Sequence, residues 1–172
     1  MTKRRFAPFL TAALLTFVAF TGCRQPASPA PKASQAKAEP GAYIPGLGEI
    51  MSLQQMRHAK LWLAGSAGNW PLAAYELDEL HEGFDDVVHF HPTHKDAPLP
   101  LDQLVPKIVG QPLKDLDAAI TAKDPARFTI AYDALTTGCN SCHQATNFGF
   151  NVVVRPAGNP YPNQSFASPG NR

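Results

Sequence analysis

The sequence predicts an all-α protein, an antiparallel four-helix bundle with a two-cysteine motif near the end of its last helix and an extended tail. Four stretches with helix-forming composition or an apolar helical repeat follow one another between residues 48 and 143, separated by segments rich in Gly, Pro and Asn. The one run typical of a strand, Val152-Val153-Val154, has no similar run to pair with. The 172 residues are enough to build a core without disulfides.

The first helix is expected over residues 50–64, a proline-free stretch of helix formers that is followed by Gly65. The second begins with Asn69 as its N-cap and Pro71 in its first turn, because both residue types favour helix starts. Its buried face is a stripe at helical spacing: Ala73, Leu77, Leu80, Phe84 and Val87. Residues 89–100 hold three histidines and three prolines and are expected to form a loop.

Pro106, Gly110 and Pro112 predict an interrupted third region, with a short piece from about residue 101 and the main helix over residues 112–122. Asp124 and Pro125 repeat the pattern of an N-cap followed by a first-turn proline. The apolar face of the fourth helix runs directly into two cysteines: Phe128, Ala131, Leu135, Cys139 and Cys142.

The N-terminus has the pattern of an export signal: three basic residues, an apolar run over residues 6–20, and then Thr21-Gly22-Cys23. Residues 20–23 resemble a bacterial lipobox, which implies that Cys23 becomes the lipidated first residue of the mature chain. Ordinary signal cleavage nearby is the alternative. We therefore expect a signal peptide over residues 1–22 and a protein that faces the periplasm, anchored to a bacterial membrane by lipid.

The rest of the chain divides into three parts by composition. Residues 23–47 are rich in Pro and Ala and predict a flexible linker. Residues 48–150 are expected to form the helical domain, and residues 151–172 an extended tail that packs on it. The formal net charge of +1 and the lack of any basic arm or RNA-binding signature argue against a nucleic-acid partner.

Cys139-Asn140-Ser141-Cys142-His143 is a C-x-x-C-H motif, the pattern of c-type haem attachment. Two thiols one helical turn apart can form thioethers with the two haem vinyl groups, and the adjacent histidine can ligate the iron. Two other uses of a C-x-x-C pair remain open. One is a thiol–disulfide redox pair, which normally lies in a βαβ setting; the other is half of a zinc site completed by scattered histidines.

The late position of this motif in a helical, exported chain resembles the class II c-type cytochromes, the cytochrome c′ group. The resemblance implies one covalent haem c, held by thioethers to Cys139 and Cys142 and ligated on its proximal side by His143. The first helix of that family often carries Arg-x-x-x-Leu, which Arg57 and Leu61 match here. By that resemblance Arg57 lies near the haem and Leu61 faces the iron.

The residue opposite His143 decides between functions, and His58, Met56 and Met51 are the candidate ligands, with an open iron or a ligand from a loop as the alternatives. A filled sixth position implies an electron carrier that serves redox partner proteins, rather than an enzyme. An open position implies a five-coordinate haem that binds NO or CO, or a peroxidase-like enzyme with His58 as its distal acid–base group. The sequence leaves homodimerisation open.

Overall fold

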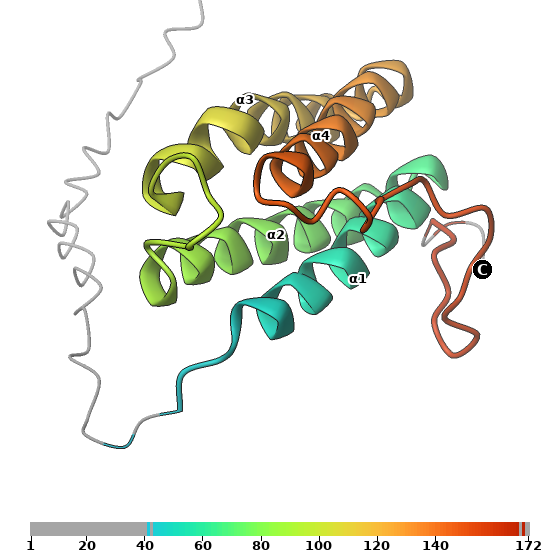
Figure 1. Cartoon of the computed structure of the whole chain (residues 1–172). Helices are drawn as coiled ribbons and strands as arrows, with labels where there is room; N and C mark the ends of the chain where they lie inside the picture. The colour runs from blue at the N-terminus through green and yellow to red at the C-terminus, as the bar shows by residue number, and fades with distance from the viewer. Residues whose placement is uncertain (1–40, 42, 169, 171–172) are drawn as a thin grey trace, which may run out of the picture. The chain divides into compact units, whose positions relative to one another are not determined.

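The computed structural model describes Gly41, residues 43–168 and Gly170, and over these residues it contains helices and no strand (Figure 1). The helices are α1 (Leu47–Ser66), α2 (Trp70–Phe90), α3 (Leu101–Ala122) and α4 (Pro125–Ala145). The predicted all-α, four-helix architecture is confirmed. Residues 1–40, which include the predicted signal peptide and Cys23, lie outside the described residues. Within the described part, no helix combines the length and the apolar character needed to cross a bilayer.

The four helices form two hairpins, because α1 and α2 are joined by only three residues and α3 and α4 by only two. α1 packs mainly on α2 and α3 mainly on α4, and the hairpins meet through α2 and α3. Both predicted N-caps are confirmed. The Asn69 side chain accepts a hydrogen bond from the Leu72 amide at 3.4 Å, and Asp124 accepts one from the Ala126 amide at 3.0 Å.

The third helix corrects the sequence analysis, because α3 is continuous through both prolines. Pro112 cannot donate to the Ile108 carbonyl. That carbonyl faces α4 at Gly138, where an added Cβ would lie 3.2 Å from it, so the two backbones approach closely. Each proline costs a helix about 3 kcal/mol. Burial of the apolar face of α3 outweighs this cost; its members are Leu104, Val109, Leu113, Leu116 and Ile120.

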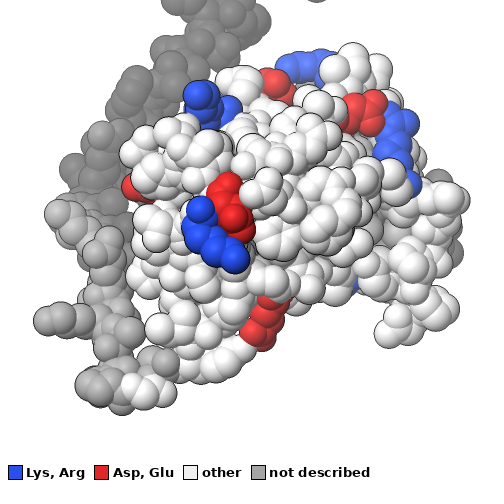
Figure 2. Space-filling view, in the orientation of Figure 1, with Lys and Arg blue, Asp and Glu red and all other residues white. Residues whose placement is uncertain are grey.

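Two clusters of buried side chains stabilise the bundle. The larger one joins all four helices and is centred on Leu61, Leu116 and Leu135, which are fully buried. The smaller one, Ile50, Val87, Leu101 and Leu104, lies where α1 begins, α2 ends and α3 begins. A cavity draws its wall from both clusters. The surface of the face in Figure 2 is largely uncharged, with its few charged side chains scattered.

The segment after α4 turns back and runs along α4 and α1 toward the other end of the bundle (Figure 1). Val153 pairs with Asn140, and Arg155 forms an ion pair with Asp133, so the segment runs antiparallel to α4. Its last part is buried: Phe166 is 7% exposed and belongs to the larger cluster. From here on, the tail means residues 148–168, which begin three residues before the tail expected from the sequence.

Gly65 in α1 is a point of close packing, because a Cβ at this position would overlap the Phe128 ring of α4. Gly65→Ala should therefore lower the free energy of unfolding by about 1–3 kcal/mol through overpacking. Gly110→Ala is the matched control, because the nearest atom to its added Cβ, in Pro106, is 4.0 Å away. The control should gain about 0.5–1 kcal/mol. Chemical denaturation measures both changes, and equal effects of the two substitutions would contradict this packing account.

Candidate functional site

A cavity of about 340 Å³ lies inside the bundle, and apolar side chains from all four helices form most of its wall. Its size is within the range of small-molecule and cofactor sites, about 300–1,000 Å³. Polar groups are few and gather on α1, on the end of α4 and on the segments that follow α2 and α4. They are Ser52, Gln54, Gln55, His58, His94, His143, Thr146 and Asn151.

Cys139 and Cys142 lie on the cavity wall, one helical turn apart on α4, and both are free thiols. Burial raises the pKa of Cys139 to about 11 and also raises the pKa of Cys142. A redox-active C-x-x-C pair needs the opposite shift, because its nucleophile is a thiolate with a lowered pKa. The environment of these thiols therefore disfavours thiol–disulfide exchange.

The histidine of the motif, His143, also lines the cavity, and its ring makes one hydrogen bond within the described residues. Its Nδ1 lies 2.6 Å from the carbonyl oxygen of Asn151 in the tail. A carbonyl oxygen can only accept, so Nδ1 carries the proton and donates it. In the neutral ring the lone pair is then on Nε2, the form in which an imidazole ligates a metal.

The sequence-predicted residues of α1 separate into two groups. Met51 and His58 are on the cavity wall. Leu61 is fully buried in the larger cluster, and Arg57 donates to Glu79 on α2 at 2.7 Å, so these two face other parts of the bundle. Met56 is partly buried and does not contribute to the described cavity wall.

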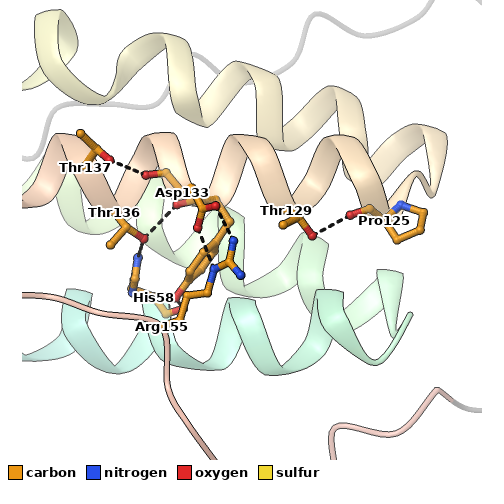
Figure 3. Close-up of polar contacts among 8 residues, drawn as sticks. His58, Pro125, Thr129, Asp133, Thr136, Thr137 and Arg155 are labelled. Atoms are coloured by element: carbon orange, nitrogen blue, oxygen red, sulfur yellow. Dashed lines mark hydrogen bonds and ion pairs between the residues drawn. The ribbon is translucent and has the colours of Figure 1, made fainter.

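His58 is 3% exposed, and both of its ring nitrogens have partners on α4 (Figure 3). Nε2 lies 2.9 Å from the Thr136 hydroxyl oxygen, and Nδ1 lies 2.9 Å from the Tyr132 hydroxyl. The Thr136 hydroxyl donates to the Tyr132 carbonyl, so its oxygen accepts from Nε2–H. The Tyr132 hydroxyl proton is then shared between Nδ1 and the His58 carbonyl oxygen, which lies 3.1 Å away. Metal ligation by His58 would have to replace one of these hydrogen bonds.

Sequence reasoning expected the tail to pack on the domain but did not name the tail groups that contribute to the site. The Asn140 side chain pairs with the backbone of Val153, and the Asn151 carbonyl reaches His143. It also missed the placement of His94, a residue of the loop before α3, on the cavity wall. Among the described residues, no three His, Cys, Asp or Glu side chains come together as a metal site.

The buried His58 gives the protein a dependence on pH. Burial lowers the pKa of His58 from 6.5 to about 4. Between these two pH values, His58 is protonated in the unfolded chain but stays neutral in the folded protein. The free energy of unfolding therefore keeps its full value above pH 6.5 and decreases by about 3 kcal/mol as the pH falls toward 4. Denaturation curves between pH 7.5 and pH 4 should show this slope. His58→Gln should reduce it, and an equal slope in both proteins would contradict the assignment.

Comparison with known proteins finds no match to this chain, whether in protein-family models, among curated proteins or among solved structures. The motif and the cavity are therefore the starting point for assigning a function. They bring together two neutral thiols, an imidazole with a free Nε2 lone pair, and an apolar space between four helices.

Proposed function

We propose that the protein is an exported monohaem c-type cytochrome, similar to the class II group, which carries single electrons between redox partner proteins. The observation that carries the proposal is the His143 ring, whose Nδ1 donates to the Asn151 carbonyl beside two free thiols on the wall of an apolar cavity. This arrangement suits covalent attachment through Cys139 and Cys142 and axial ligation through Nε2 of His143.

When bound, a haem would supply an iron that exchanges one electron without any bond being made or broken in the protein. The residues of the chain then hold it, orient its axial imidazole and exclude water. Apolar side chains from α2, α3 and α4, among them Phe84, Val105, Ile108 and Leu135, line the space where the ring would lie. A dry, rigid wall keeps the reorganisation of solvent on electron transfer small.

We further propose Met51 as the second axial ligand. Electron carriers hold their iron with two protein ligands. Among the three candidates predicted from the sequence, Met51 is the one that lines the cavity with a ligating atom that makes no hydrogen bond within the described residues. The ring nitrogens of His58 are both engaged, and Leu61 lies in the larger cluster. The engagement of His58 also favours a second function, a five-coordinate haem that binds NO or CO, if Met51 does not ligate.

Attachment is tested by exporting the full chain in a host with a c-type haem maturation system. The wild-type protein should carry one haem that resists extraction with acidified acetone, because thioethers are covalent. Cys139→Ser combined with Cys142→Ser should abolish attachment. Cys23→Ser is the matched control: it should keep the haem but move the protein from the membrane to the soluble fraction. A haem-free wild-type chain would refute the proposal.

Axial ligation is tested by absorption and EPR spectra of the haem-loaded protein. The wild-type protein should be low-spin and inert to CO, and Met51→Leu should become high-spin and bind CO. His58→Leu should keep the low-spin spectrum, because His58 hydrogen-bonds to α4 instead. A low-spin spectrum that survives Met51→Leu and is lost in His58→Leu would assign the ligand to His58. A wild-type protein that binds CO would favour the gas-binding function.

A further inference from the structure

The tail contacts the C-x-x-C-H motif through two side chains of that motif. Asn140 donates from Nδ2 to the Val153 carbonyl at 2.9 Å, and its Oδ1 accepts from the Val153 amide at 2.8 Å. This pair of hydrogen bonds satisfies both polar groups of one tail residue, as a neighbouring strand would. These two bonds therefore fix the position of Val153 along the axis of α4.

The Asn151 carbonyl, two residues earlier, is the group that accepts from His143. Only Val152 separates Asn151 from Val153, so the two Asn140 bonds to Val153 also hold the backbone of Asn151 close to α4. The side chains that alternate with Asn151 and Val153 along the tail are exposed: Phe150 is 82% exposed, Val152 64% and Val154 67%. Their contacts do not hold the tail in place. Asn140 fixes the tail on the C-terminal side of Asn151. On the N-terminal side, the Asn151 amide donates to the Phe148 carbonyl at 2.8 Å and the Phe148 amide donates to the His143 carbonyl at 2.7 Å.

A second fixed point lies further along the tail. Arg155 donates from Nε to Asp133 at 2.7 Å and forms an ion pair with the same carboxylate (Figure 3). Its guanidinium also lies 4.4 Å from the centre of the Trp62 ring. The two ion-paired side chains are 39% and 52% exposed, so this pair contributes little by itself. The Asn140 bonds are part-buried and are the stronger restraint on the register.

We propose that Asn140 is a positioning residue for the axial histidine, which acts through the tail by holding the Asn151 carbonyl against Nδ1 of His143. This inference rests on the proposed haem function. A carbonyl on Nδ1–H fixes the tautomer and the orientation of the ring and increases electron donation from Nε2 to a metal. Stronger donation favours the ferric over the ferrous state, so the tail lowers the reduction potential.

The test compares Asn140→Ala with Ser141→Ala in the haem-loaded full chain. Ser141 is the other variable residue of the motif, and its exposed hydroxyl donates only within α4, to the Thr137 carbonyl. Asn140→Ala should shift the reduction potential to more positive values. By NMR, it should speed exchange of the His143 Nδ1 proton about tenfold, the equivalent of one net hydrogen bond. Ser141→Ala should change neither quantity.

Asn140→Asp guards against a folding defect in the alanine variant, with helix content by circular dichroism as the check. Aspartate keeps the acceptor for the Val153 amide and loses the donor to its carbonyl, so the Nδ1 exchange rate should fall between wild type and Asn140→Ala. The reduction potential is compared only between the uncharged variants, because the added carboxylate lowers it directly. Wild-type potential and Nδ1 exchange in Asn140→Ala would overturn the inference and leave the haem function standing. A wild-type chain without covalent haem would instead overturn both.

Discussion

One apolar stripe on α4 determines both how this helix joins the bundle and where its cysteines lie. Phe128, Tyr132 and Leu135 on this stripe are almost completely buried among the other helices. Cys139 and Cys142 continue the same stripe over the next two turns and so reach the cavity wall. Because a helix is stiff over this length, burial of its first turns fixes the direction of its last ones. The placement of the two thiols is thus a consequence of hydrophobic packing three turns away.

Local patterns in the sequence were enough to predict four helical regions and the position of two cysteines on the apolar face of the last one. Asn69 and Asp124 cap α2 and α4 because their side chains reach amides two or three residues ahead, an interaction contained within a few residues. The interruption of α3 was predicted wrongly for the opposite reason. Pro106 and Pro112 are local breakers, whereas the burial that overrides them depends on helices elsewhere in the chain. The packing of α3 against the other helices thus outweighed the low helix propensity of its two prolines.

The parts of the site that escaped prediction depend on contacts between distant residues or on the backbone. His58 meets Tyr132 and Thr136 across 74 and 78 residues of sequence, so the state of its ring nitrogens is decided only when α1 and α4 pack together. Asn151 acts through its carbonyl, a group that every residue has, so residue type carries no signal for this role. Asn140 occupies a variable position of the motif, where no residue type is prescribed.

The burial of the end of the tail gives the protein a mechanical link between its two ends. Ala167 accepts a hydrogen bond from the Asn69 side chain at the junction of α1 and α2, and Phe166 is anchored in the core beside it. That junction is about 30 Å from the start of α1, the length of a 20-residue helix. A single unbranched stretch of chain connects this anchor to the carbonyl against His143. The same stretch of chain therefore touches both ends of the bundle, with Val153 and Arg155 held to α4 between its buried end and the imidazole.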